Sequence, residues 1–261
     1  SDKGKVLRQI TENLRRYQKS LVRDRMDDVE AFFNENVDFY GRKGHVSYDD
    51  YFLTFLRVRD DLNLNLLDIG GGAGAFAEQV VNTCPNISVT VLDPSERLLD
   101  LIDDNRIIKV KGKLPNLNPI NSKFDYIHVK EVFHHITGSS VNSSKELLRE
   151  SLFAIKKSLK DNGFLLINEL FYESYLIPSY SRNLIFYLLR LQNKLGIKIP
   201  AKEFLLGLNV CFYSRSEFTT ILNNCGFEVV DYYEEKWADT YKKKALFLKD
   251  WGRMLFILKK C

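Results

Sequence analysis

The spacing of hydrophobic residues along the chain changes near residue 65. Before that point, apolar side chains recur at helical spacing in MDDVEAFFNENVDFY and SYDDYFLTFLRV, which predicts a helical cap over residues 1–60. After it, short apolar or alternating runs (NLLDIG, ISVTVLD, IIKVKG, FDYIHVK and FLLINELF) are separated by helix-like segments. That alternation is typical of βαβ units, so we expect an α/β core with a mostly parallel sheet and helices on both faces.

The clearest intervening helix is SSKELLRESLFAIKKSLKDNG. Ser143 and Glu146 have the spacing of a capping box, and Gly163 has the character of a helix terminator. One face of the helix is apolar: Leu148, Leu152, Ile155 and Leu159. We therefore expect the helix to begin after Ser143 and to end before Gly163.

Residues 172–212 interrupt the strand and helix alternation with a segment rich in Leu, Ile, Phe and Tyr. We interpret it as a helical insert whose apolar residues pack in the core, cover the active site as a lid, or face a membrane or partner. Ser214 and Glu217 can cap the next helix, Gly226 ends it, and a strand follows. GRMLFILKK is expected to be a last, antiparallel strand. The chain thus divides into a core over 61–171, the insert over 172–212, and a C-terminal completion of the sheet over 213–261.

Composition narrows the class of protein. A chain of 261 residues with 45% hydrophobic residues can form one large folded domain. No segment approaches the roughly 20 apolar residues of a membrane-spanning helix, so we expect a cytoplasmic protein without stable membrane insertion. The net charge of +4 is spread among interspersed acids and bases, which argues against a nucleic-acid partner. The four cysteines are widely separated, which favours free thiols over a metal site or disulfides.

The stretch LLDIGGGAGAF places glycines directly after an apolar run and before a helical pattern. Gly70, Gly71, Gly72 and Gly74 would let a ligand approach the backbone closely, above the exposed N–H groups of a helix N-terminus. This predicts a nucleotide-type site. Gly70, Gly72 and Ala75 also satisfy the fingerprint of NAD-binding folds, so the glycines alone leave the cofactor open.

Two acids flank this loop in the expected sheet. Asp68 ends the first strand, where dinucleotide sites usually carry an apolar residue, and a carboxylate there can fix the loop and the amino end of a zwitterionic ligand. Asp93 ends the next strand in VLDPSERLL, where it can accept hydrogen bonds from a ribose diol. NAD-binding folds use the same device, so Asp93 does not separate the two cofactors.

Together, LLDIGGGAGAF, VLDPSERLL and FDYIHVKEVFHHI resemble the first, second and fourth motifs of class I S-adenosylmethionine-dependent methyltransferases, in particular the ubiquinone and menaquinone type of small-molecule enzymes. The resemblance covers about residues 64–170. It implies a Rossmann-like, seven-stranded sheet with its last strand antiparallel. It also implies S-adenosylmethionine as cofactor, S-adenosylhomocysteine as product, and no metal.

The resemblance also implies roles for individual residues. The glycines would lie beneath the methionine portion of the cofactor, Asp68 would orient the loop and the cofactor's amine, and Asp93 would bind both ribose hydroxyls. Further cofactor contacts are implied near the adenine for Pro94, Ser95 and the backbone of Gly112, Lys113 and Leu114, and near the methionine end for Lys130 and Glu131. Lys113 stands where the family often has an acid that contacts the adenine amine.

Candidate catalytic residues follow the fourth and fifth strands. His134 and His135 face the rim where the family places the acceptor, and an imidazole can accept a proton near neutral pH, so one of them, His135 in preference to His134, is a candidate base. Packing or shaping of the substrate site is the alternative. Glu169 ends the fifth strand at the same edge, as a catalytic group or a solvated acid. His45 and His128 are interpreted as structural, and four tyrosines as core or cavity residues: Tyr172, Tyr175, Tyr180 and Tyr213.

The sequence therefore predicts a methyltransferase acting on a small, partly hydrophobic molecule. Methylation of oxygen is favoured because it gains most from a base, whereas nitrogen or a stabilised carbon could react with positioning alone. An RNA or protein methyltransferase and a non-catalytic cofactor-binding protein of the same fold are the alternatives. Nothing in the sequence indicates an oligomeric state.

Overall fold

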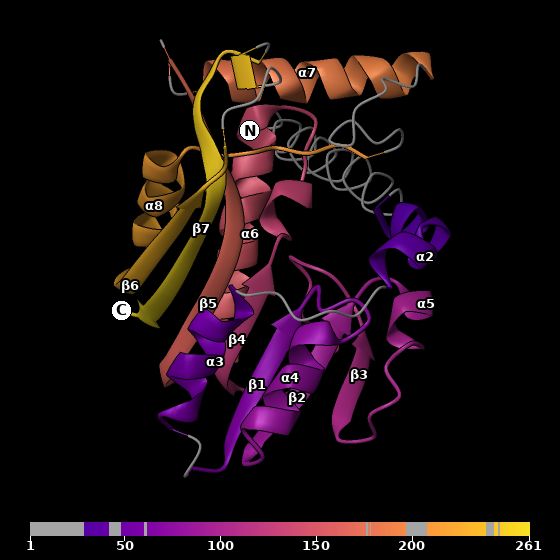
Figure 1. The fold of residues 1–261 in the computed structure, drawn as a ribbon, viewed down its shortest axis with the longest axis vertical. Coiled ribbons are helices and arrows are strands. Elements are labelled where there is room, and N and C mark those ends of the chain that lie inside the picture. Colours follow the sequence, from indigo (N-terminus) through magenta and orange to yellow (C-terminus); the bar gives the residue numbers. More distant parts are fainter. Residues whose placement is uncertain are drawn as a thin grey trace, which may run out of the picture.

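The computed structural model of the protein describes residues 29–41, 48–59, 62–175, 177, 179–196, 208–238, 243–244 and 246–261. Seven strands form one sheet in the order β3-β2-β1-β4-β5-β7-β6 (Figure 1). The strands are β1 (Leu64–Ile69), β2 (Ile87–Asp93), β3 (Ile107–Lys111), β4 (Phe124–Lys130), β5 (Leu159–Ser174), β6 (Phe227–Lys236) and β7 (Leu248–Lys260). The first five strands are parallel, and β7 runs antiparallel to both β5 and β6. The Rossmann-like sheet with an antiparallel last strand is confirmed.

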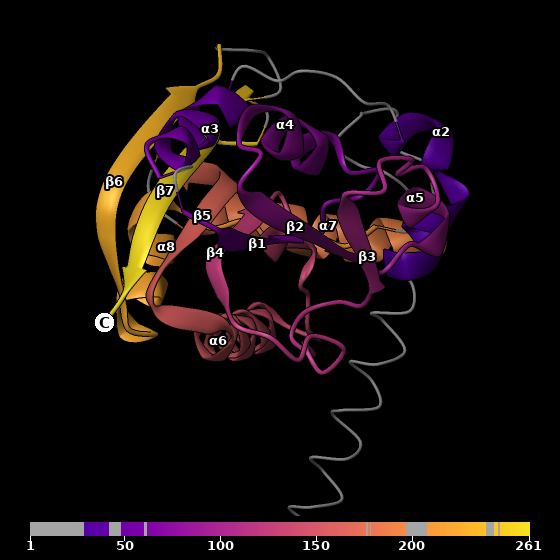
Figure 2. The same cartoon turned by 90° about the horizontal axis from the view of Figure 1, so that it is seen from below.

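Helices cover both faces of this sheet (Figure 2). On one face lie α3 (Asp49–Arg57) and α4 (Ala75–Thr83), and on the other α6 (Val141–Ser158) and α8 (Arg215–Asn224). Two short helices, α2 (Val37–Tyr40) and α5 (Glu96–Leu99), lie near the β3 edge, and α7 (Tyr180–Leu195) crosses one end of the molecule (Figure 1).

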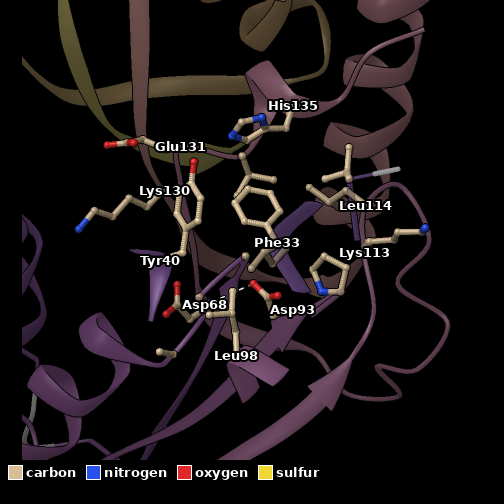
Figure 3. Close-up of a pocket in the computed structure, with 18 of the residues that line it drawn as sticks. Phe33, Tyr40, Asp68, Asp93, Leu98, Lys113, Leu114, Lys130, Glu131 and His135 are labelled. Carbon is tan, nitrogen blue, oxygen red and sulfur yellow. Dashed lines mark hydrogen bonds between the residues drawn. The ribbon is translucent and has the colours of Figure 1, made fainter. Parts of the chain in front are cut away.

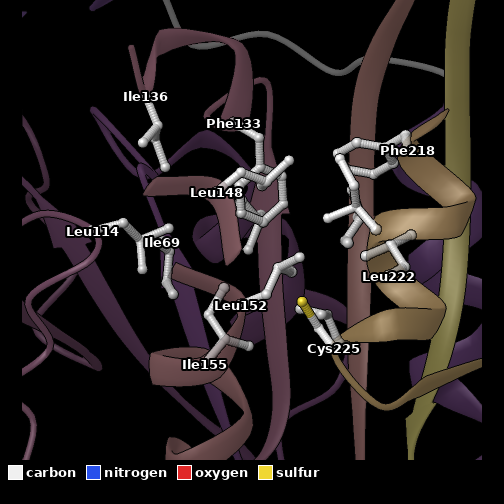
Figure 4. Packing of buried hydrophobic residues seen from close by; sticks show 14 of the residues in the cluster. Ile69, Leu114, Phe133, Ile136, Leu148, Leu152, Ile155, Phe218, Leu222 and Cys225 are labelled. Atoms are coloured by element: carbon white, nitrogen blue, oxygen red, sulfur yellow. The ribbon is translucent and has the colours of Figure 1, made fainter. Parts of the chain in front are cut away.

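Each face of the sheet has its own hydrophobic core. Leu148, Leu152 and Ile155 of α6 pack with Phe218 and Leu222 of α8 in one core (Figure 4). The other core joins apolar residues of α3 and α4: Phe52, Leu53, Leu56, Phe76, Ala77 and Val80. Strands between two such layers are buried on both faces, which explains why β1 and β2 are nearly continuous apolar runs in the sequence.

The predicted start of α6 is wrong, and Gly163 does not terminate the helix. The helix begins at Val141 because Ser140 and Ser143 form the capping box, in which each hydroxyl accepts a hydrogen bond from the other residue's backbone N–H. It ends at Ser158 because β5 begins at once, with Leu159 paired to Phe124 of β4. Gly163 therefore lies inside β5, where a side chain would come 3.0 Å from the carbonyl oxygen of Asp125.

The C-terminal half matches the sequence interpretation more closely. Ser214 caps α8 by accepting a hydrogen bond from Glu217 N, and Gly226 follows the helix with a positive φ of 78°. The insert begins later than expected, because β5 continues through Ser174. Of the predicted apolar face of α7, Ile185 and Leu189 are buried.

The described residues of α7 share a third hydrophobic cluster with the segment before α2. Ile185 and Leu189 of α7 pack with Phe32, Phe212 and Trp251. The helical cap and the insert are thereby joined above the end of the sheet. Within the described residues, no helix is long and apolar enough to cross a membrane.

Neighbouring positions on α6 give a matched test of this fold. Leu152→Ala removes a fully buried side chain and should lower the free energy of unfolding by about 2–5 kcal/mol. Phe153 is 49% exposed on the same helix, so Phe153→Ala should change it by less than about 1 kcal/mol. Urea unfolding followed by circular dichroism measures both. Equal losses for the two variants would contradict the packing of α6.

Candidate active site

A cavity of about 320 Å³ opens at the carboxyl ends of β1, β2 and β4 (Figure 3). Its base is formed by the glycine loop together with Asp68, Asp93 and His128. Other walls come from the loops after β3 and β4: Gly112, Lys113, Leu114, Lys130, Glu131, Val132, His135 and Ile136. The segment before α3 contributes Val29, Phe33 and Tyr40. Ligands of open α/β sheets bind at this edge.

The conformation of the glycine loop excludes other residues. Gly70, Gly72 and Gly74 have φ values of 70°, 53° and 79°, which L residues with side chains rarely adopt. A Cβ on Gly70 would also lie 2.3 Å from Cγ2 of Val132. Gly70 to Gly72 line the cavity, whereas Gly74 precedes α4 as its N-cap and does not.

Asp93 connects this loop to the neighbouring strand. Its carboxylate accepts hydrogen bonds from the backbone N–H of Gly72 at 2.9 Å and of Ser95 at 2.8 Å. Burial raises the pKa of Asp93 to about 6, although both hydrogen bonds oppose the shift. Asp93 is therefore mostly ionised at pH 7 and can accept further hydrogen bonds. Ser95 is buried as the N-cap of α5 and does not line the cavity, whereas Pro94 does.

Asp68 and His128 form a buried pair below the glycine loop. Oδ1 of Asp68 lies 2.7 Å from Nδ1 of His128, and Phe76 stacks on the imidazole. The second oxygen, Oδ2, is buried without a hydrogen-bond partner among the described residues. His128 thus has the structural role expected of it, and it also lines the cavity, which the sequence interpretation missed. His45 lies outside the described residues.

The two charged residues at the end of β4 are held from outside the cavity. Nζ of Lys130 points away from it, to the buried carboxylate of Asp49 at 2.8 and 2.9 Å (Figure 3). Glu131 has a positive φ of 55°, and its Oε1 accepts a hydrogen bond from Nη1 of Arg253 at 2.5 Å. Both side chains line the cavity, but their charges are already engaged. Gly112, Lys113 and Leu114 line the cavity as the resemblance implies.

Glu169 is buried behind the cavity wall. Its carboxylate accepts hydrogen bonds from Phe133 N at 2.9 Å and Leu170 N at 2.8 Å, and Oε1 lies 2.6 Å from Nδ1 of His134. Burial lowers the pKa of His134, but the charge of Glu169 and the hydrogen bond to it outweigh burial, so the pKa is raised. Neither Glu169 nor His134 lines the cavity. The two side chains hold the turn that carries His135.

His135 is the one of the three candidate catalytic side chains that lines the cavity (Figure 3). Burial, together with the positive charge of His134, holds its pKa well below the ordinary value. Its Nδ1 is buried and has no hydrogen-bond partner in the described structure. The site therefore presents a neutral imidazole near pH 7.

The roof of the cavity comes from a segment that sequence reasoning treated only as a cap. Asn34 connects this segment to the start of α5. Its side-chain oxygen accepts a hydrogen bond from Ser95 Oγ at 2.7 Å, and its carbonyl accepts one from Arg97 at 2.6 Å. No described residue of α7 lines the cavity, so a direct lid role for α7 is wrong for those residues. The four tyrosines named from the sequence also lie elsewhere: Tyr172 and Tyr213 are buried in the cores, and Tyr175 and Tyr180 are exposed.

Comparison with known proteins identifies the family and the fold. A family model described as a methyltransferase domain matches residues 40–232, more than half of the chain. The protein belongs to the methyltransferase domain family. Its fold is that of the class I, S-adenosylmethionine-dependent methyltransferases. The resemblance drawn from the three sequence motifs is confirmed.

Relatives of this methyltransferase are distant. Malonyl-[acyl-carrier protein] O-methyltransferase 2 of Ilyobacter polytropus is 30% identical over 112 residues, which cover 36% of this chain and 41% of that protein. The magnesium protoporphyrin IX methyltransferase of Synechocystis PCC 6803, solved with bound S-adenosylhomocysteine, has a TM-score of 0.56 at 14% identity over 89% of this chain and 98% of that one. A methyltransferase of Clostridium acetobutylicum gives 0.55 at 14% identity over 88% and 98%. These structures share the fold.

The cavity has features that suit S-adenosylmethionine, the cofactor that the sequence resemblance implies. The unpartnered Oδ2 of Asp68 is a buried acceptor beside the loop, and a positively charged amine is a matching donor. Because Gly70 and Gly71 have no side chains, a ligand in the cavity can approach their backbone closely.

The pKa of Asp93 predicts how cofactor affinity depends on pH. If Asp93 binds the ribose hydroxyls, as the sequence resemblance implies, only its ionised carboxylate can accept from both, so binding is full above the pKa of about 6 and weakens below it. The Kd of S-adenosylhomocysteine, measured by calorimetry, should rise by up to about tenfold per pH unit between pH 6 and pH 5. Asp93→Asn should bind more weakly with little change over this range. A wild-type Kd that is equal at pH 5 and pH 7.5 would contradict this role.

A second prediction concerns the buried pair behind the wall. Glu169→Gln removes the negative charge that raises the pKa of His134, so the imidazole should lose its proton at lower pH than in the wild type. Histidine NMR titration measures the change. Glu173→Gln is the control, because Glu173 binds Arg215 instead. An unchanged His134 titration in Glu169→Gln would contradict the pairing.

Proposed function

We propose that this methyltransferase acts on a small, partly hydrophobic molecule and that it methylates an oxygen atom. The observation that carries the proposal is His135: a neutral, buried imidazole that faces the cavity with an unpartnered Nδ1. A group of this kind can take the proton of an acceptor hydroxyl. The name of the Ilyobacter relative, a malonyl O-methyltransferase, agrees with oxygen as the acceptor atom; because a malonyl group offers a carboxylate oxygen, the name does not support a hydroxyl acceptor.

The lining and roof of the cavity support a small acceptor. Near His135 the walls are apolar, with Phe33, Val132 and Ile136, and the volume of about 320 Å³ lies in the range of small-molecule sites. Phe33 and Tyr40 cover the space between His135 and the two acids in Figure 3. An RNA or protein methyltransferase would instead need an open groove that admits a polymer, so a nucleic-acid partner is not part of this proposal.

In this proposal the cofactor is held along the base of the cavity. The Asp93 carboxylate accepts from the ribose hydroxyls, Oδ2 of Asp68 accepts from the amino group, and the backbone of Gly70 to Gly72 lies against the methionine portion. Pro94, Leu98 and Leu114 give an apolar contact for the adenine. When bound, S-adenosylmethionine supplies a methyl group activated on a sulfonium for in-line displacement.

His135 would act as the base. As the acceptor oxygen forms its bond to the methyl carbon, its hydroxyl proton passes to Nδ1 of His135 and later to solvent. Glu169 and His134 act as positioning residues, because they fix the Phe133 to His135 turn through backbone and imidazole hydrogen bonds. The closed, apolar surroundings exclude water from the reacting groups.

The charges around the cavity favour a hydroxyl over a carboxylate as acceptor. A carboxylate acceptor would be held by Lys or Arg, but of the two lysines in the lining Lys130 is engaged by Asp49, and the Lys113 side chain extends away from His135 (Figure 3). An amine or a stabilised carbon needs no base, so it would leave His135 without a catalytic role.

His135→Asn tests the proposal. We expect kcat for a hydroxylated acceptor to fall by about 10²–10⁴, because the amide cannot serve as a base, while the calorimetric Kd of S-adenosylhomocysteine changes by less than about threefold. Acceptors are found by measuring S-adenosylhomocysteine release with phenols, alcohols, amines and carboxylic acids. Methyl transfer to amines or acids alone, or an unchanged kcat in His135→Asn, would refute oxygen methylation through His135.

A further inference from the structure

The outer side of α7 carries a continuous apolar stripe. One hundred degrees of rotation per residue places six large apolar side chains within one sector of the helix: Tyr180, Leu184, Tyr187, Leu188, Leu191 and Leu195. Tyr187, Leu191 and Leu195 are 57%, 53% and 57% exposed. The opposite side of the helix already packs in the third hydrophobic cluster through Ile185 and Leu189. The stripe is therefore additional to what the fold requires.

Exposed apolar residues outside the helix extend this stripe at its N-terminal end. The ring of Phe247, which is 57% exposed, lies 5.9 Å from that of Tyr180, centroid to centroid. The backbone N–H of Tyr180 donates to the carbonyl of Ile177, which is also exposed. Figure 1 shows α7 across one end of the molecule, above the carboxyl edge of the parallel strands. A continuous exposed patch of this kind marks an interaction surface. We call it the α7 surface: Ile177, Tyr180, Leu184, Tyr187, Leu188, Leu191, Leu195 and Phe247.

The charged residues of α7 are all basic, and Arg182 among them is buried and paired with Glu217. In the sequence, residues 174–202 contain no Asp or Glu, and their charged residues are all basic: Arg182, Arg190, Lys194, Lys198 and Lys202. Among the described residues, Lys194 is exposed beside the stripe, and Lys244 and Lys249 are exposed on the chain flanking Phe247. Arg190 is used within the fold, since it donates to the carbonyl oxygens of Gly138 and Ser139.

We propose that the α7 surface docks onto an anionic lipid bilayer. A helix whose outer face is built of Leu and Tyr, with only basic charges beside it, matches a bilayer interface: the apolar side chains enter the acyl boundary and the lysines meet the lipid phosphates. A second copy of this chain is a poorer match, because a two-fold contact through this surface would place the basic flanks of both copies together. Docking here is peripheral, with α7 parallel to the bilayer plane.

Vesicle binding tests the proposal directly. The full chain is sedimented with vesicles of phosphatidylcholine alone and of phosphatidylcholine containing phosphatidylglycerol at about one part in three. We expect binding to the anionic vesicles, and a loss of at least about tenfold in Leu191→Asp/Leu195→Asp, because both side chains are exposed and the substitution opposes apolar burial and lipid charge. Phe153→Asp is the matched control: it places an acid at an exposed aromatic on α6, away from α7, and should bind vesicles as the wild type does.

Two further measurements make the outcomes decisive. Lys194→Glu should weaken binding to anionic vesicles and leave binding to neutral ones unchanged. Light scattering in solution tests the second copy: a dimer that Leu191→Asp/Leu195→Asp dissociates, with no vesicle binding by the wild type, would overturn the proposal. Equal vesicle binding by wild type and the double variant would overturn it too. Calorimetry with S-adenosylhomocysteine reports the cofactor site separately, so failure of lipid docking is distinguishable from failure of the proposed methyl transfer.

Discussion

The site depends on one buried carboxylate that joins two strands. Asp93 at the end of β2 accepts a hydrogen bond from Gly72 N in the loop after β1, and another from Ser95 N at the start of α5. These bonds hold a glycine turn in backbone conformations that other residues rarely adopt. The Asp93 carboxylate thus fixes the glycine loop and the start of α5 at the same time. Because Asp93 is buried in this arrangement, its pKa is raised to about 6.

A second buried carboxylate, that of Glu169, fixes the part of the cavity wall that carries His135. Glu169 gathers Phe133 N, Leu170 N and the His134 imidazole, and so fixes the short turn that presents His135. The charge of His134 in turn helps to keep His135 neutral. The two ends of the cavity are therefore built from different strands, and each is held by a buried acid, Asp93 of β2 or Glu169 of β5. The segment before α3 covers both ends, and the contacts of Asn34 with Ser95 and Arg97 hold it in place.

Much of this was predictable, because strands buried on both faces and a glycine turn leave strong local patterns. The sheet, the antiparallel β7, the glycine loop and Asp93 were all evident from the sequence. The start of α6 was not, since Ser140 and Ser143 compete with Ser143 and Glu146 as equally plausible caps. Two features were missed because each brings together residues far apart in the chain: the place of Tyr40 in the cavity wall and the pairing of Asp68 with His128. Burial of Glu169 was not predicted, because the sequence suggested that the fifth strand ends there, whereas β5 continues through Ser174.

We expect the cofactor and His135 to share one cavity, with Asp93 at the ribose and His135 at the reacting end. A crystal structure with bound S-adenosylhomocysteine tests this most directly. We expect both ribose hydroxyls within hydrogen-bond distance of the Asp93 carboxylate, and the sulfur turned toward the part of the cavity that His135 lines. A ribose bound away from Asp93, or a sulfur separated from His135 by the cavity wall, would contradict the account.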